Sequence, residues 1–107
     1  MNITDRNHLQ TTLPACLDTM RTKGYTEDFE ATKEGLKSHQ SNHIYAPDEL
    51  VLKAVFRFKA DSDPNNNSIA YFIETEDGRR GVVLDAYGIY ANPLVGEIMK
   101  KCEEVKG

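Results

Sequence analysis

Two runs of alternating apolar and polar residues, 68–76 and 79–87, lie on either side of the dipeptide Asp77-Gly78. An Asp-Gly pair between such runs is typical of a β-hairpin, because a type I′ turn needs positive φ at both central residues. A two-residue turn here sets the register, which pairs Ile73 with Val82, Tyr71 with Leu84, and Ile69 with Ala86. Such cross-strand pairs stabilise a sheet, so the pattern predicts one apolar face built by both strands.

A third strand is predicted over residues 50–59, where apolar and polar positions again alternate. One of its faces would carry Leu50, Leu52, Ala54, Phe56 and Phe58. The second face of the three strands is charged, as a face in contact with water should be. It also carries Val51, Val55, Phe72 and Val83. Either the segment 25–47 covers these four residues, or they form a partner surface.

Two amphipathic helices flank the strands. The first is predicted over residues 12–23, because Thr12 can cap it, Pro14 fits its first turn, and Gly24 stops it. Its core-facing residues are Leu13, Cys16, Leu17 and Met20. The second helix begins after Asn92-Pro93, and its apolar face consists of Leu94, Val95, Ile98, Cys102 and Val105.

The segment between the first helix and residue 50 has weaker patterns. Residues 29–37 predict a poor or edge strand broken near Gly35, and 47–49 (Pro-Asp-Glu) predict a single helical turn. The expected fold is therefore α+β: an antiparallel sheet of three to four strands with an N-terminal and a C-terminal helix packed on one face. We expect one domain over residues 1–107, with residues 1–8 frayed.

Composition narrows the classes of function. The formal net charge is −4, and no block of basic residues is present to neutralise phosphates, which disfavours nucleic-acid binding. The chain has no run of about 18 apolar residues and no apolar signal-peptide core, so no membrane contact is expected. Cys16 and Cys102 fit a reducing compartment as buried thiols better than as a disulfide. The expected setting is the cytoplasm.

Two segments of the chain carry a resemblance to a known family: Gly24-Tyr-Thr-Glu-Asp-Phe29 and Gly81-Val-Val-Leu-Asp-Ala-Tyr-Gly-Ile-Tyr-Ala91. Between them come, in order, a Pro-Asp-Glu turn, a strand and an Asp-Pro pair. On these residues the chain resembles, over about residues 12–101, a family of small bacterial proteins. That family is often labelled "phosphoribosylpyrophosphate synthetase". The resemblance implies the same order of elements and a cytoplasmic setting. It implies no catalytic residue, since the phosphate loop and acidic metal cluster of that enzyme have no counterpart here.

Two patterns suggest metal binding, and each has a simpler interpretation. Residues 61–67 have the alternating oxygen ligands that open a calcium loop, but Phe72 stands where the loop needs Glu, which favours a solvated connection. His39 and His43 are four apart, but no second ligand pair accompanies them. The seven glycines are dispersed and form no phosphate loop. We therefore predict no metal site, no cofactor and no catalytic residue.

The best candidate site is the strand end 85–90. Large rings with polar tips lie there beside a glycine that permits close approach of a ligand. The candidate residues are Asp85, Tyr87, Gly88 and Tyr90, which Tyr25, Asp28 and Arg57 would join in space. In the alternative interpretation, the two tyrosines of this segment are packing residues with satisfied hydroxyl groups.

We expect a non-enzymatic binding or regulatory module for a protein partner or a small polar ligand. The alternative is a small enzyme, or a nucleotide- or phosphoribosyl-related accessory protein, that uses Asp85, Tyr87 and Tyr90. A homodimer is a third possibility, formed by pairing of an exposed edge such as the poor strand 29–36.

Overall fold

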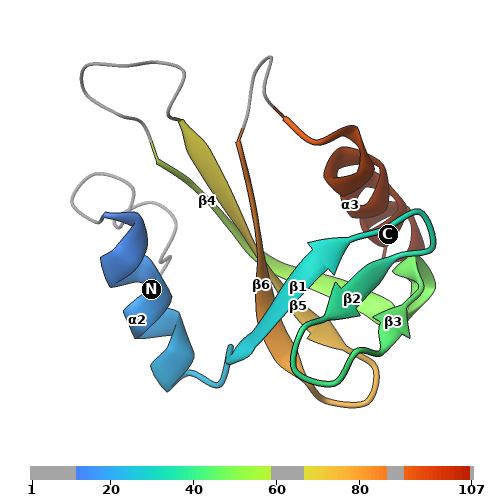
Figure 1. Ribbon diagram of the computed structural model, residues 1–107, viewed down its shortest axis with the longest axis horizontal. Helices are drawn as coiled ribbons and strands as arrows, with labels where there is room; N and C mark the ends of the chain where they lie inside the picture. Colours follow the sequence, from blue (N-terminus) through green and yellow to red (C-terminus); the bar gives the residue numbers. More distant parts are fainter. Residues whose placement is uncertain (1–11, 59–66, 87–90, 107) are drawn as a thin grey trace.

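The computed structural model describes residues 12–58, 67–86 and 91–106, which form a six-stranded sheet, two α-helices and a short 3₁₀ turn (Figure 1). In chain order the elements are α2 (Leu13–Thr22), β1 (Glu27–Ala31), β2 (Leu36–Ser38), β3 (Ile44–Tyr45), η1 (Pro47–Glu49), β4 (Leu50–Phe58), β5 (Ser68–Thr75), β6 (Arg80–Ala86) and α3 (Pro93–Lys106). The α+β class predicted from the sequence is confirmed, as is the single helical turn at residues 47–49.

The strands lie in the order β3-β2-β1-β6-β5-β4. Neighbouring strands are antiparallel except for β1 and β6, which run parallel. The expectation of three to four antiparallel strands is therefore wrong in both number and direction. β1, β2 and β3 are five, three and two residues long, too short for a clear period-two pattern. That brevity explains why their sequence predicts only one poor strand.

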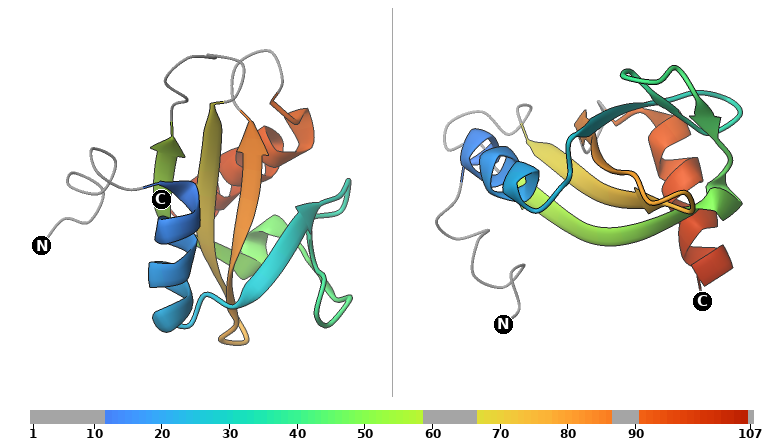
Figure 2. Two further views of the ribbon diagram at one scale, coloured as in Figure 1. Left: turned by 60° about the vertical axis from the view of Figure 1, so that its left-hand side comes forward. Right: turned by 90° about the horizontal axis from the view of Figure 1, so that it is seen from below.

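The two helices pack on opposite faces of the sheet, so the prediction that both share one face is wrong (Figure 2). Successive strand residues point to opposite faces, and both neighbours are apolar at the centre of β5 (Phe72, Ile73) and of β6 (Val82, Val83). All four of these side chains are at most 3% exposed. A sheet that is apolar on both sides needs cover on both sides.

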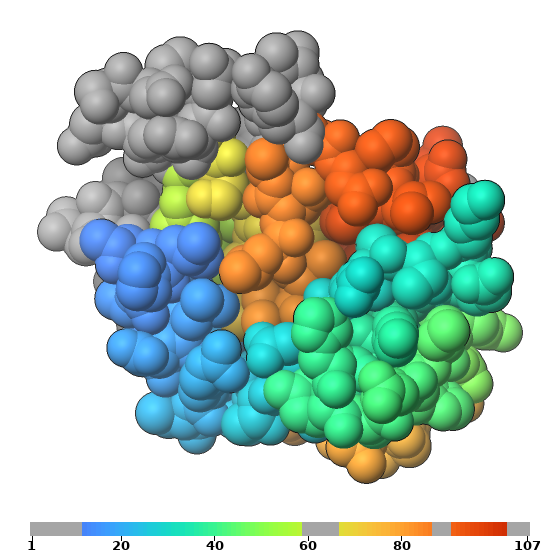
Figure 3. Space-filling model, viewed as in Figure 1, coloured from blue at the N-terminus to red at the C-terminus, as the bar shows by residue number. Residues whose placement is uncertain are grey.

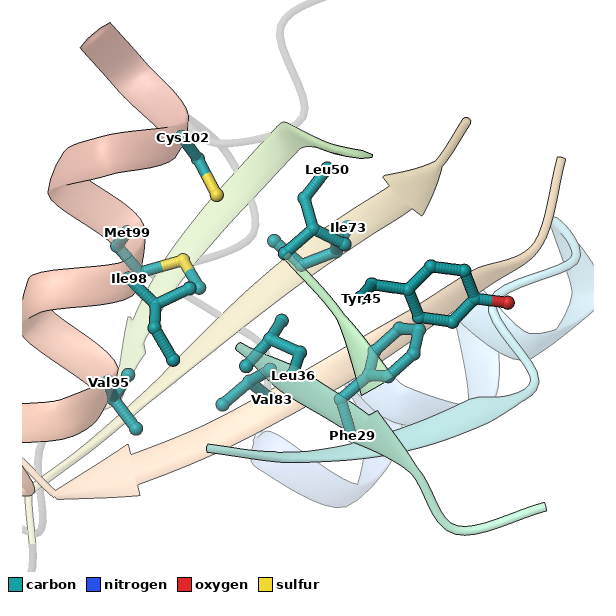
Figure 4. Packing of buried hydrophobic residues seen from close by; sticks show 10 residues of the cluster. All are labelled: Phe29, Leu36, Tyr45, Leu50, Ile73, Val83, Val95, Ile98, Met99 and Cys102. Atoms are coloured by element: carbon teal, nitrogen blue, oxygen red, sulfur yellow. The ribbon is translucent and has the colours of Figure 1, made fainter. Parts of the chain in front are cut away.

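The α3 side holds the larger cluster of buried residues (Figure 4). The sheet curves round α3, with β1–β3 on one side of the helix and β4 on the other (Figure 2). The cluster consists of Phe29, Leu36, Tyr45, Leu50, Ile73, Val83, Val95, Ile98, Met99 and Cys102. Asn92 caps α3 through a hydrogen bond of 2.9 Å from the Leu94 N–H to its Oδ1, as predicted. The side chain of Val105, which was also predicted on the apolar face of this helix, lies outside the described residues.

The α2 side holds a second cluster, formed by Cys16, Met20, Tyr25, Phe56, Ala70, Phe72 and Val82. The predicted helix is confirmed with its N-cap, because Thr12 Oγ1 accepts a hydrogen bond from the Ala15 N–H at 3.3 Å. Gly24 follows the helix with φ of 97°, the conformation that ends many helices. The first helix thus covers Phe72, which the sequence left open as a partner-surface residue.

β4 changes face at a β-bulge. Leu52 is paired with Ile73 and Ala54 with Phe72, so one extra residue of β4 lies between these two pairs. Before the bulge Leu50 and Leu52 pack on the α3 side, and after it Ala54, Phe56 and Phe58 pack on the α2 side. The predicted single apolar face of this strand is therefore wrong, because alternation in sequence gives no sign of an inserted residue.

The β5–β6 hairpin has a three-residue connection instead of the predicted two-residue turn. The Thr75 N–H donates to the Arg79 C=O at 2.8 Å, and Gly78 has φ of 91°, whereas Asp77 is not among the described residues with positive φ. This geometry fits a type I turn followed by a left-handed glycine. The register is one residue away from the prediction, so Phe72, instead of Ile73, lies opposite Val82.

Gly81 is the residue that lets β1 join the sheet. Glu27 pairs with Gly81, and a Cβ atom at Gly81 would lie 2.3 Å from the Glu27 backbone oxygen and 2.7 Å from Phe29 Cε2. The close approach therefore requires glycine here. β1 consequently lies inside the sheet between β2 and β6, and the prediction of an edge strand at 29–36 is wrong. A dimer that pairs 29–36 as an outer edge strand does not fit this strand order.

Two remaining expectations concern the helices. Cys16 and Cys102 are buried thiols, one in each core cluster, as predicted. Burial raises the pKa of Cys16. Neither of the described helices has the length and apolar character needed to cross a membrane.

Candidate functional site

Asp85 lies at the end of β6, and its carboxylate holds both ends of the connection to α3. Its Oδ1 accepts hydrogen bonds from the Ala86 N–H at 2.8 Å and from the Asn92 N–H at 3.0 Å. The side chain therefore fixes where the strand ends and where the last helix begins. The other residues predicted for this segment, Tyr87, Gly88 and Tyr90, lie outside the described residues.

Arg57 is on the same row of the sheet as Asp85. Both residues pair with Ile69, Arg57 from β4 and Asp85 from β6, so their side chains leave the same face. Two strand spacings, about 10 Å, separate their backbones. Arg57 and Asp85 are therefore on one row of the sheet, with Ile69 between them. Among the described contacts no ion pair joins the two side chains.

Tyr25 does not belong to this group. It lies on the α2 side, 8% exposed, with its ring 5.5 Å from the Phe72 ring in an edge-on contact. The Arg80 guanidinium stands 5.7 Å from the Tyr25 ring centre, and Arg80 is the first residue of β6, at the end of the strand opposite Asp85. Burial raises the pKa of Tyr25. Tyr25 is thus a packing residue of the α2 core.

A polar network that the sequence did not reveal lies at the opposite end of the sheet from Asp85. The Ser38 hydroxyl donates to Glu27 Oε1 at 2.5 Å, and Arg79 Nη1 donates to Glu27 Oε2 at 3.3 Å. The Tyr45 hydroxyl donates to Asp77 Oδ2 at 3.0 Å. These residues come from β1, β2, β3 and the hairpin turn, so no spacing in the sequence could have joined them.

This network ties strands together and offers little to a substrate. Ser38 is fully buried, so its hydroxyl cannot meet a molecule from solution, and the Glu27 side chain is only 12% exposed. A buried carboxylate needs such partners, because an unpaired one would carry a large desolvation cost. A hydrogen bond from Thr75, followed by one from Tyr45, holds the pKa of Asp77 below its usual value. Burial, with the hydrogen bond to Asp77, raises the pKa of Tyr45.

The other carboxyl of the turn, that of Glu76, has its pKa shifted in the opposite direction. A hydrogen bond with the Glu49 carboxyl raises the pKa of Glu76, and the Glu76 N–H also donates to the Glu49 C=O at 2.8 Å. These contacts join η1 to the hairpin turn. In the described parts of the chain, no three His, Cys, Asp or Glu side chains come close enough to hold a metal ion. His39 Nε2 instead lies 3.0 Å from Glu30 Oε1.

The part of β6 beyond Val82 is open on the α2 side. Leu84 is 47% exposed, although its strand lies inside the sheet between β1 and β5. Figure 3 shows residues of β6 at the surface, between α2 and β1–β2. The parallel pairing of β1 with β6 covers only Glu27 with Gly81 and Asp28 with Val82. Past this point the two strands diverge (Figure 1), and neither covers Leu84, which is exposed.

Carboxylates stand on both sides of Leu84. On β1, Glu30 is on the same face as Asp28, and its side chain is 61% exposed. On α2, Arg21 reaches Asp28 at 3.7 Å, so this flank of the helix faces β1. Asp18, one turn before Arg21, is exposed on the same flank. We call Leu84, Asp18 and Glu30 together the Leu84 surface.

The chain was compared with protein-family models, with curated proteins and with solved structures, and nothing matches. The family resemblance inferred from the sequence therefore stays a prediction. Function has to be argued from the geometry of the chain alone.

Proposed function

We propose that this protein is a non-enzymatic binding module that docks a protein partner on the Leu84 surface. The observation that supports this most is the 47% exposure of Leu84 in the interior of a sheet. A strand that is apolar on both faces, as β6 is at Val82 and Val83, is ordinarily covered on each face. Leu84 therefore offers a partner an apolar contact that the fold itself does not cover.

The position of the other exposed apolar residues supports the same choice. Among the described residues, the further large apolar side chains with high exposure are Ile44 at 40% and Val51 at 39%. Ile44 lies on β3 and Val51 on β4, the two edges of the sheet, where partial exposure is common. Leu84 is different because its strand has a neighbour on each side within the sheet, and the pairing with one of these neighbours, β1, ends before Leu84.

The enzyme alternative has less support. It would use Asp85 as a reacting group, but both oxygens of Asp85 accept hydrogen bonds from the Asn92 N–H, and Oδ1 accepts another from Ala86. Ser38 and the thiols of Cys16 and Cys102 are buried. A nucleophile has to reach its substrate, and a general base needs a lone pair that the fold does not already use.

Site-specific photo-crosslinking in cells that express the protein tests this proposal. A benzophenone amino acid replaces Leu84 in one variant and Val51 in the matched control. We expect a discrete adduct from position 84 and none of the same mass from position 51. The partner recovered in this way should bind the purified Leu84→Ser protein about tenfold more weakly than the Val51→Ser protein. Equal binding to both variants would contradict the proposal.

A further inference from the structure

The backbone of β6 has hydrogen-bonding groups that point toward the opening. In the β5–β6 ladder, Thr75 and Arg79 form a hydrogen-bonded pair, and such pairs recur at every second residue of an antiparallel ladder. Val83 and Asp85 therefore bond to β5, whereas the N–H and C=O of Leu84 point the other way, toward β1. Among the described strands, the parallel pairing stops at Val82, one step before these groups would be used.

We propose that an extended segment of a partner protein adds to β6 at Leu84, and that this segment carries an apolar side chain flanked by Lys or Arg. This inference rests on the proposed function and names the chemistry of its partner. A strand that pairs with a free backbone edge gains main-chain hydrogen bonds, and the neighbouring side chains determine which sequences fit. The backbone of Leu84 supplies the free edge, and its side chain supplies an apolar contact.

The charge of the partner follows from the sides of the opening. Glu30 on β1 and Asp18 on α2 are both exposed, and neither has an ion pair with a Lys or Arg among the described side chains. Arg21 on α2 is already paired with Asp28. Glu30 has His39 Nε2 at 3.0 Å and Lys37 as its cross-strand neighbour, with no ion pair between Glu30 and Lys37. The whole chain is also acidic, with a net charge of −4. A basic segment meets these carboxylates favourably, whereas an acidic one is repelled.

The outer edge strand β4 is a poorer place for such a segment. It is nine residues long, but it carries the bulge and the exposed cations Lys53 and Arg57. Bulges and lysines on an edge strand are features that prevent pairing with other chains. A second copy of this chain would bring its own cationic edge against them. The opening at Leu84 has neither feature.

Titration of the ¹⁵N-labelled full chain with synthetic peptides tests the inference. The probe is acetyl-Gly-Lys-Val-Leu-Val-Lys-Gly-amide, and the charge control has Glu in place of both Lys. The backbone control is N-methylated at its Leu and at both Val residues, so that it lacks the bonding N–H groups in either strand direction. We expect saturable amide shifts centred on Leu84 and Glu30 with the Lys peptide. Affinity should fall about tenfold with the Glu peptide, with the N-methylated peptide and in Leu84→Ser, whereas Val51→Ser should bind normally.

Each other result overturns a defined part of the inference. Equal affinity for the Lys and Glu peptides would overturn the basic partner, and equal affinity for the N-methylated peptide would overturn strand addition. Shifts of Leu84 that depend on protein concentration without peptide would assign the surface to a second copy. If no peptide binds while the crosslinked partner still depends on Leu84, the inference fails and the proposed function stands. Failure of both experiments would remove the proposed function too.

Discussion

The two faces of the sheet differ in how completely a helix covers them. On the α3 side the sheet curves round the helix, and the two together bury ten residues, from β3 at one flank to β4 at the other. On the α2 side a ten-residue helix covers residues of β4, β5 and the first part of β6, and Leu84 is left 47% exposed. The difference shows that the curvature of the sheet completes the core on the α3 side. On the α2 side, the sheet keeps an exposed surface beside the core.

The strongest way to break this comparison is to remove the centre of the α2 cluster. Phe72 is fully buried and makes edge-on contacts with Tyr25 at 5.5 Å and Phe56 at 5.6 Å. Phe72→Ala should lower the free energy of unfolding by about 3–5 kcal/mol, measured by urea titration. Ile73→Ala, the neighbour on the other face, should cost about 2–5 kcal/mol. A loss below about 1 kcal/mol for Phe72→Ala would show that α2 and its core lie outside the cooperative unit.

The second prediction concerns the joint between β1 and β6. Gly81→Ala places a methyl group against the Glu27 backbone, which should lower the free energy of unfolding by about 1–3 kcal/mol. Gly96→Ala is the matched control, because a Cβ atom there meets nothing within 4 Å and alanine favours the helix by about 1 kcal/mol. Thermal melting should therefore move in opposite directions for the two variants. A neutral result for Gly81→Ala would mean that β1 can move away from β6 without cost.

The third prediction sharpens the comparison at the uncovered surface. Leu84→Ser should lower the free energy of unfolding by only about 1 kcal/mol, because about half of the side chain is already exposed. Chemical denaturation of Leu84→Ser and of Val51→Ser provides the measurement. A loss as large as that of a core residue would mean that Leu84 is held by packing and is unavailable to a partner.

The smallest effects are expected from the two carboxyls of the hairpin turn, which respond to pH with opposite sign. The pKa of Glu76 is raised, so its contribution to stability is present below the usual Glu pKa and lost as pH rises through the raised value. The pKa of Asp77 is lowered, so its contribution is present above the usual Asp pKa and lost as pH falls through the lowered value.

Urea titrations between about pH 3 and pH 7 check both signs. Each amide resembles the protonated carboxyl, so both variants should match the parent protein at the acidic end. At the neutral end Glu76→Gln should be more stable than the parent protein and Asp77→Asn less stable. Parallel curves for either variant and the parent protein would show that the corresponding pKa is not displaced by folding.

The fold could be predicted where periodicity was long and uninterrupted. The helix capped by Thr12, the helix capped by Asn92 and the hairpin around Gly78 all follow from local signals, and the structure confirms them. The bulge in β4 and the third residue in the hairpin turn could not be predicted, because each adds one residue without changing the composition of its strand. Each of these features exchanges the faces of the residues beyond it.

The candidate site was predictable only in part. Arg57 and Asp85 do share a face, because the bulge in β4 and the extra turn residue each shift one of them by one residue relative to β5, and the two shifts cancel. Tyr25 lies on the α2 face, at the end of β6 opposite Asp85, since its position depends on the turn after α2. The exposure of Leu84 arises from the divergence of β1 and β6, a tertiary feature that no local pattern contains.

The mixed sheet also has a consequence for the kinetics of folding. Two antiparallel meanders, β1–β2–β3 and β4–β5–β6, form from neighbours in the sequence, and only two parallel residue pairs join them. Closing the joint brings Glu27 to Gly81 and encloses all of the intervening chain in one loop, which carries the largest entropic cost of any contact in the sheet. The joint should therefore form after both meanders, and a substitution at Gly81 should speed unfolding more than it slows folding.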